Sequence, residues 1–110
     1  SMGIDRKPAQ ITQASIIGLP EIPTTKLLMI QRAEMHESQN QWEKAASVYQ
    51  DAINQGFETN QIMFGHARAL KNTHQLENVN KGNDILKKIA EGKTDDFWKQ
   101  LATELIASKQ

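Results

Sequence analysis

The side chains best suited to acid–base or metal chemistry in this sequence are three histidines, His36, His66 and His74. Histidine is the usual general acid or base near neutral pH and a common metal ligand. None of the three belongs to an H-E-x-x-H motif, and no two of them are four residues apart. The chain has no cysteine, which excludes a thiolate nucleophile and a thiolate metal site. We therefore predict structural histidines, with no catalytic, cofactor or metal site.

Other groups that could do chemistry have simpler explanations. Asp95 and Asp96 lie at the start of a predicted helix, where the helix dipole stabilises acidic side chains. Lys81, Lys87 and Lys88 are interleaved with acidic residues, as on a solvated helix face. The sequence contains neither a G-x-x-x-x-G-K phosphate loop nor a G-x-S-x-G serine motif. We predict that the chain is not an enzyme.

Length and charge limit the partners that we expect. The 110 residues favour a single domain. Thirteen basic and thirteen acidic residues cancel, so the chain lacks the basic footprint of a nucleic-acid-binding protein. No apolar run approaches the roughly 18–20 residues that cross a bilayer, and the first residues lack the apolar core of a signal peptide. We expect a soluble protein without nucleic-acid or membrane partners, and we favour the cytoplasm.

The elements that would position any site are helices. Residues 1–24 hold all three prolines and predict an extended segment, with one short helix in PAQITQASIIG. From Thr24 onward the capping and helix-ending residues predict five helices. Thr59 and Thr94 are the predicted N-terminal caps, and Gly56 is predicted to take the left-handed conformation after a helix. Their short connections imply antiparallel neighbours, and no window alternates with the period of a strand. The predicted fold class is all-α.

The first, third and fifth helices repeat one pattern of apolar residues. Ala33, Ala67 and Ala102 are separated by 34 and then 35 residues. Large side chains stand four residues before each alanine, at Met29, Met63 and Trp98. The second and fourth helices align at a shift of 34, which pairs Trp42, Ala45, Tyr49 and Ala52 with Leu76, Val79, Asn83 and Leu86. Small residues at such positions let two helices approach closely.

This pattern resembles the tetratricopeptide repeat, a helix-turn-helix unit of 34 residues. Trp98-x2-Leu101-Ala102 matches the first half of the unit, and Ala45-x3-Tyr49 followed by Ala52 matches the second. The resemblance implies helical hairpins stacked as a short right-handed α-solenoid over residues 25–110. The first repeat covers about 25–58 and the second about 59–93, and a third-repeat or capping helix covers about 94–108.

Several positions depart from the family pattern. Arg32, His36, His66 and Asn83 replace apolar or aromatic residues, the proline between repeats is absent, and one residue is inserted in the second repeat. The register of the fourth helix therefore stays open. A Sel1-like or generic α-solenoid repeat remains an alternative.

In the family, the first helix of each hairpin lines a concave groove that holds a peptide. The resemblance therefore implies a protein–protein interaction module. An alternative for Ile30 and Phe64 is that they belong to the core. Some members of the family clamp the carboxylate of a peptide, but this sequence has other residue types at the clamp positions, so we predict no such clamp. The residues at these positions are Ile30, Glu34, Gly65, Asp96 and Gln100. The partner-binding candidates are Ile30, Glu34, Glu37, Phe64, Arg68, Lys71, Asn72, Lys99 and Thr103.

Two other functions fit the same repeat pattern. The chain could be a scaffold or regulatory segment of a larger enzyme or signalling protein, because its third repeat has only one helix. It could bind RNA, as pentatricopeptide arrays do, although its zero net charge argues against this. The apolar face of the last helix, which includes Phe97, Trp98 and Leu101, predicts a monomer or a weak homodimer through that helix.

Overall fold

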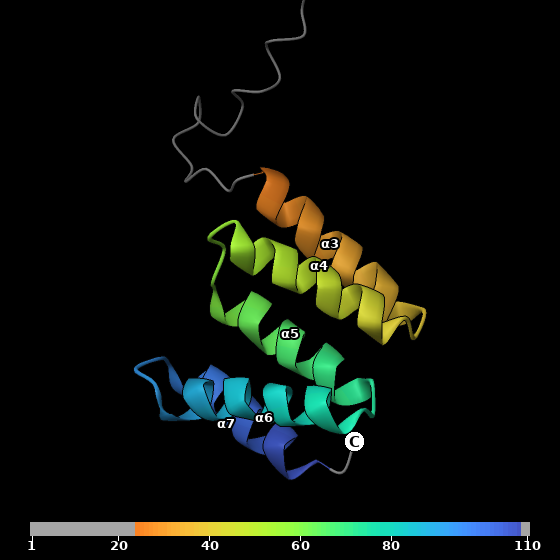
Figure 1. Cartoon of the computed structure of the whole chain (residues 1–110). Coiled ribbons are helices and arrows are strands. Elements are labelled where there is room, and N and C mark those ends of the chain that lie inside the picture. Colours follow the sequence, from red (N-terminus) through yellow and green to blue (C-terminus); the bar gives the residue numbers. More distant parts are fainter. Residues whose placement is uncertain (1–23, 109–110) are drawn as a thin grey trace, which may run out of the picture.

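The computed structural model describes residues 24–108, and over this range the chain is entirely helical (Figure 1). The prediction of five helices without a strand is confirmed for these residues. The short helix predicted within residues 1–24 lies outside the described range. No helix between residues 24 and 108 is both long and apolar enough to span a membrane. The helices are α3 (Thr24–Ser38), α4 (Trp42–Asn54), α5 (Asn60–Asn72), α6 (Leu76–Glu91) and α7 (Asp96–Ala107).

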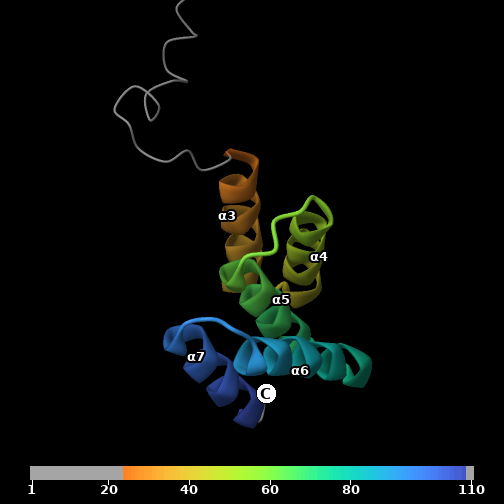
Figure 2. The ribbon, with the colours of Figure 1, turned by 90° about the vertical axis from the view of Figure 1, so that its left-hand side faces the viewer.

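Each helix packs on its neighbours in the chain. Helix α3 contacts α4, α4 contacts α5, α5 contacts α6, and α6 contacts α7, while α5 also touches α7. In Figure 2 the first hairpin, α3 and α4, stands upright, whereas α6 lies across its direction. Helix α5 is therefore the central element, because it joins the first hairpin to the second and also reaches α7.

The repeated alanines lie inside the core. Ala33, Ala67 and Ala102 are all fully buried, as is Ala45. Two apolar clusters surround them. The first joins α3, α4 and α5 around Ala33 and Ala45, and the second joins α5, α6 and α7 around Ala67, Leu86 and Ala102. The prediction that the alanine column marks the helix crossings agrees with this burial.

Two glycines bring other helices against α5. A Cβ atom on Gly65 would lie 2.5–2.8 Å from ring atoms of Tyr49, so the phenol ring of α4 packs directly on the backbone of α5. A Cβ atom on Gly82 would lie 2.9 Å from the carbonyl oxygen of Ala67. The α5–α6 approach is therefore made at Gly82, three residues after Val79, which the repeat alignment pairs with Ala45. Leu76, which that alignment pairs with the half-buried Trp42, is 77% exposed.

The helix ends follow the expected chemistry with one correction. Thr59 caps α5 as predicted, because its hydroxyl accepts a hydrogen bond from the Ile62 amide at 3.3 Å. Gly56 has a φ of +96°, which confirms the predicted left-handed turn after α4. At α7 the cap is Asp95, not Thr94. The Asp95 carboxylate accepts from the Trp98 amide, while the Thr94 hydroxyl accepts from the Asn60 side chain at 2.5 Å.

Candidate functional site

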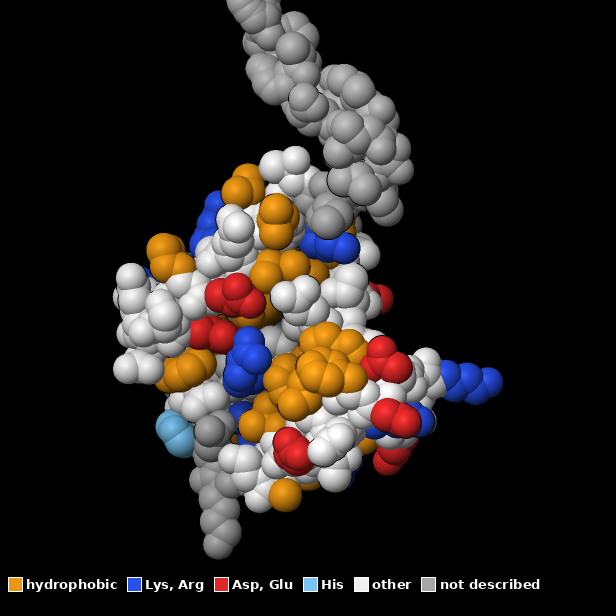
Figure 3. All heavy atoms as spheres, turned by 180° about the vertical axis from the view of Figure 1, so that it is seen from behind, with side chains coloured by type: hydrophobic (Ala, Val, Ile, Leu, Met, Phe, Trp, Pro, Cys, Tyr) orange, Lys and Arg blue, Asp and Glu red, His pale blue; other side chains and the backbone are white. Residues whose placement is uncertain are grey.

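The side chains that could meet a partner gather around one face of α5. Residues 61, 64 and 68 are three and four positions apart, so they share that face. Beside them lies a cavity of about 180 Å³, which is lined by Glu34, Tyr49, Gln61, Phe64, Arg68, Phe97, Trp98 and Leu101. We call this the aromatic cavity. Figure 3 shows an apolar patch on this side of the molecule, bordered by basic and acidic side chains.

Three aromatic rings lead from the core to the surface beside the aromatic cavity. Phe64 is 9% exposed, and its ring centroid lies 5.8 Å from that of Trp98, with the planes tilted by 55°. Phe97 meets Trp98 edge to face at 5.1 Å and is 61% exposed. Tilted and edge-to-face pairs are the arrangements that aromatic quadrupoles favour. The stack therefore holds a large apolar side chain, Phe97, in solvent at the mouth of the cavity.

Arg68 forms the polar wall of the cavity and ties three helices together. Its Nη2 and Nε atoms donate to the two carboxylate oxygens of Glu37 on α3, at 2.9 and 3.2 Å. Nη2 also donates to the Tyr49 hydroxyl on α4 at 3.4 Å. Its guanidinium carbon lies 5.5 Å from the centre of the Phe64 ring, which is a cation–π geometry. Most of the hydrogen-bonding capacity of Arg68 is therefore used within the fold.

Burial governs the electrostatics of this network. It raises the pKa of Glu37, more than the hydrogen bond and charge of Arg68 lower it. Burial, followed by the negative charge of Glu37, raises the pKa of Tyr49 to about 12. Burial lowers the pKa of Arg68, but the hydrogen bond and charge of Glu37 outweigh it, so the net shift is upward. Near neutral pH Arg68 is therefore charged and Tyr49 is a neutral hydrogen-bonding phenol.

Lys71 does not lie on the surface that the repeat pattern implied. It is only 2% exposed, and its Nζ atom donates to the carbonyl oxygens of Leu105 at 2.6 Å and Ser108 at 3.5 Å. These carbonyls belong to the end of α7, where a cation is favoured by the helix dipole and by unpaired acceptors. Burial lowers the pKa of Lys71. Lys71 therefore anchors α7 to α5 and presents no ammonium group to a ligand.

The other predicted binding residues are spread over several environments. Glu34 is exposed and lines the aromatic cavity, whereas Ile30 is 8% exposed and belongs to the first apolar cluster. The Asn72 amide donates to the Arg68 carbonyl within α5. On α7, Lys99 is half-buried and Thr103 is exposed, and neither lines the cavity. Of the nine candidates, the structure brings Glu34, Phe64 and Arg68 together at the cavity, with Glu37 held by Arg68.

Sequence reasoning missed four residues that line this site, namely Tyr49, Phe97, Trp98 and Leu101. Tyr49 was interpreted as packing alone, and Phe97 and Trp98 as an apolar helix face. Most of that face is half-buried against α5 and α6, at Trp98, Leu101, Leu105 and Ile106, while Phe97 stays exposed. Glu34 and Arg68 are 34 residues apart in one repeat column, but the ion-pair partner of Arg68 is Glu37, three residues further along α3. The repeat column alone therefore did not identify the ion pair.

The histidines occupy three different settings. His36 shares a hydrogen bond of 2.7 Å with Gln41, which helps to close the turn between α3 and α4. His74 lies exposed in the turn before α6, with a φ of +59°. His66 is only 7% exposed, and burial followed by the nearby charge of Lys81 lowers its pKa. Among residues 24–108, no three His, Cys, Asp or Glu side chains are grouped closely enough to hold a metal ion.

Comparisons of this chain with protein-family models, with curated proteins and with solved structures found no match.

Proposed function

We propose that this chain is a non-enzymatic interaction module on a tetratricopeptide-like solenoid, and that it binds a protein segment at the aromatic cavity. The observation that carries the proposal is the position of Phe97, which is 61% exposed at the mouth of that cavity and packed on Trp98. Exposed aromatic side chains beside a preformed cavity are typical of binding hot spots. An apolar anchor from the partner would fill the cavity and cover Phe97.

The size of the cavity favours a side chain of a protein over a free small molecule. Its volume of about 180 Å³ is below the range of roughly 300–1,000 Å³ that is usual for small-molecule pockets. The walls on three sides come from Phe64, Trp98 and Leu101, which are apolar. The site therefore suits a single aliphatic or aromatic side chain of an extended or helical peptide.

Charged groups at the cavity would orient a bound peptide. Glu37 and Tyr49 occupy Nε and Nη2 of Arg68, which leaves Nη1 as the donor for an acidic group of the partner. Glu34 also lines the cavity, and its side chain is exposed. A peptide with an apolar anchor next to an acidic residue is the ligand that this arrangement favours. Most of the binding free energy would come from the anchor.

A displayed peptide library tests the proposal before any natural partner is identified. Peptides are selected on the full chain, and their affinities are then measured for the Phe97→Ala variant. We expect a loss of about tenfold or more, the usual effect of truncating a hot-spot aromatic. Leu76→Ala is the matched control, because Leu76 is also a highly exposed apolar residue but lies on α6, away from the cavity. Equal affinities for the wild type and Phe97→Ala would defeat the proposal.

The scaffold function and the oligomeric state stay predictions. A segment of a larger protein could use the same aromatic cavity to hold a neighbouring domain. A weak homodimer through α7 would have to cover Phe97, since this is the most exposed aromatic residue of that helix. Light scattering at two protein concentrations, on the wild type and on Phe97→Ala, separates self-association from binding of another partner.

A further inference from the structure

A second and larger cavity lies on the other side of α5. Its volume is about 550 Å³, and it is lined by residues of α4, α5 and α6 alone: Glu43, Ala46, Ser47, Gln50, His66, Leu70, Asn78, Lys81, Asp84 and Ile85. We call it the histidine pocket. It shares no residue with the aromatic cavity. His66 is two residues from Phe64 and from Arg68, which places it about 200° around the helix from each of them.

The floor of the histidine pocket combines apolar groups with a polar atom that has no partner. Leu70 is 8% exposed, and Ala46 and Ile85 extend the apolar surface. His66 is 7% exposed, and its Nδ1 atom is buried without a hydrogen-bond partner. A buried polar atom without a partner is costly, and a polar ligand group in the floor would remove that cost. This feature distinguishes the pocket from an ordinary surface hollow.

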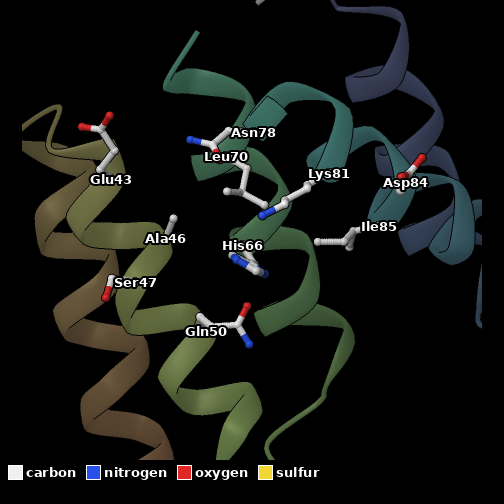
Figure 4. A pocket seen from close by; sticks show the side chains of 10 residues that line it. All are labelled: Glu43, Ala46, Ser47, Gln50, His66, Leu70, Asn78, Lys81, Asp84 and Ile85. Carbon is white, nitrogen blue, oxygen red and sulfur yellow. The ribbon is translucent and has the colours of Figure 1, made fainter. Parts of the chain in front are cut away.

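Among residues 24–108, Lys81 is the only lysine or arginine that lines the histidine pocket. Figure 4 shows its ammonium group directed towards His66, in the middle of the pocket. Between residues 24 and 108 the one ion pair is that of Arg68 with Glu37, so Lys81 is unpaired over this range. The Lys81 ammonium group and the imidazole ring of His66 therefore lie together above the apolar floor. An anionic oxygen placed there would accept hydrogen bonds and neutralise the ammonium charge.

Two carboxylates also line the pocket, and they lie at its edges. In Figure 4, Glu43 and Asp84 stand at opposite sides, and both point away from His66. The Glu43 carboxylate accepts a hydrogen bond of 2.7 Å from the Gln75 side chain, outside the pocket. The centre of the pocket therefore presents nitrogen donors above apolar side chains, and its acidic groups belong to the rim.

We propose that the histidine pocket binds a small organic carboxylate, with the carboxylate between Lys81 and His66 and the apolar part on Leu70 and Ile85. The volume of about 550 Å³ is within the usual range for small-molecule sites. An ammonium group and an imidazole at one end of an apolar floor favour a ligand that is charged at one end only. This ligand site is independent of the peptide site, because the two cavities are separate.

Three probes of nearly equal shape test the charge requirement. Benzoate, benzamide and benzylamine are titrated separately into the isotopically labelled full chain, and amide chemical shifts are followed by nuclear magnetic resonance. We expect saturable shifts with benzoate, centred on Ala46, His66, Leu70 and Ile85, and affinities about tenfold lower for the other two probes. Benzamide or benzylamine binding as tightly as benzoate would overturn the proposal. Failure of benzoate to saturate these residues would also overturn it.

A pair of lysine variants tests the assignment of the anion site. Lys81→Met keeps the length of the side chain and removes its charge, and Lys81 is exposed, so the fold should tolerate the change. We expect benzoate affinity to fall about tenfold. Lys87→Met is the control, because Lys87 is exposed on the same helix and lines none of the cavities described. Equal losses in the two variants, or no loss in Lys81→Met, would contradict the site.

Discussion

On one face of α5, Arg68 donates to Glu37 and Tyr49, while on the opposite face the Nδ1 atom of His66 has no partner. The charged groups of the first face are therefore engaged in holding α3, α4 and α5 together, and its exposed feature is an aromatic ring. The second face keeps an unpaired lysine above an apolar floor. The two proposals therefore assign different kinds of recognition to the two faces of α5, apolar on one side and ionic on the other.

Removing the arginine is expected to have the largest effect on stability. Arg68→Met deletes the ion pair and leaves Glu37, whose side chain is 12% exposed, without its partner. We expect a loss of about 2–3 kcal/mol in the free energy of unfolding, less than for a fully buried pair because Arg68 is 35% exposed. Denaturant titration measures the change. The double variant Arg68→Met with Glu37→Leu should recover part of the loss, because no unpaired carboxylate then remains. If the effects of the two single substitutions simply added up in the double variant, the energetic coupling of Arg68 with Glu37 would be contradicted.

A substitution of Gly65 on α5 should disrupt its contact with Tyr49. Gly65→Ala places a Cβ atom 2.5–2.8 Å from the phenol ring, so the ring must move away from Arg68. Overpacking costs typically 1–3 kcal/mol, and the better helix propensity of alanine offsets about 1 kcal/mol of it. We expect a net loss of up to about 2 kcal/mol in a thermal or denaturant unfolding experiment. Asn80→Ala, at an exposed position of α6, is the control and should not destabilise the protein.

The link between α5 and α7 should be weaker than the arginine network. Lys71→Met keeps most of the buried stem and removes the bonds to the Leu105 and Ser108 carbonyls. We expect a loss of about 1 kcal/mol, the usual net value of such hydrogen bonds. Faster amide hydrogen exchange should appear in α7 and not in α3. Uniform acceleration over all five helices would contradict a local role for Lys71.

On the opposite face of α5, His66 should make the free energy of unfolding depend on pH. The pKa of His66 is lowered in the folded protein, chiefly by burial, so the unfolded chain takes up a proton more readily. Its contribution to stability is therefore fully present above the unfolded pKa of about 6.5 and is lost as pH falls through the folded pKa. His66→Leu should reduce this dependence in unfolding curves at pH 7 and pH 5. An unchanged difference between the two pH values would contradict the assignment.

The smallest expected effect on stability belongs to the residue that we expect to matter most for binding. Phe97→Ala removes a side chain that is 61% exposed, so the free energy of unfolding should change by about 0.5 kcal/mol or less. Circular dichroism melting measures it, with Leu76→Ala as the control. A loss as large as that of Arg68→Met would show that Phe97 supports the fold rather than a partner.

The general architecture could be predicted because its causes are local or periodic. Capping residues such as Thr59, the left-handed Gly56 and the spacing of apolar residues predicted the helices, and the repeated alanines are buried. Lys71 and Gly82 could not be placed in this way. The contacts of Lys71 reach carbonyls 34 and 37 residues away, and the α5–α6 approach at Gly82 depends on the register of α6.

The site was predictable in part for the same reason. Phe64 and Arg68 were named because the resemblance to the tetratricopeptide repeat implied a groove on the first helix of each hairpin, and both line the aromatic cavity. Tyr49 and Trp98 were missed as cavity residues, since a packing residue also lines a cavity wherever its neighbours leave space. The carboxylate of Asp95 and the hydroxyl of Thr94 compete for one helix end, and only the contact with Asn60 decides between them.

The most direct test of the proposed function is the footprint of a selected peptide on α5. A peptide enriched on the wild type is titrated into the isotopically labelled chain, and amide shifts are compared for the two faces. We predict the largest shifts around Gln61, Phe97 and Leu101. The affinity obtained from the concentration dependence of these shifts should equal that from a separate binding measurement. Shifts centred instead on the histidine pocket, at Ala46, His66 and Ile85, would contradict the proposed function.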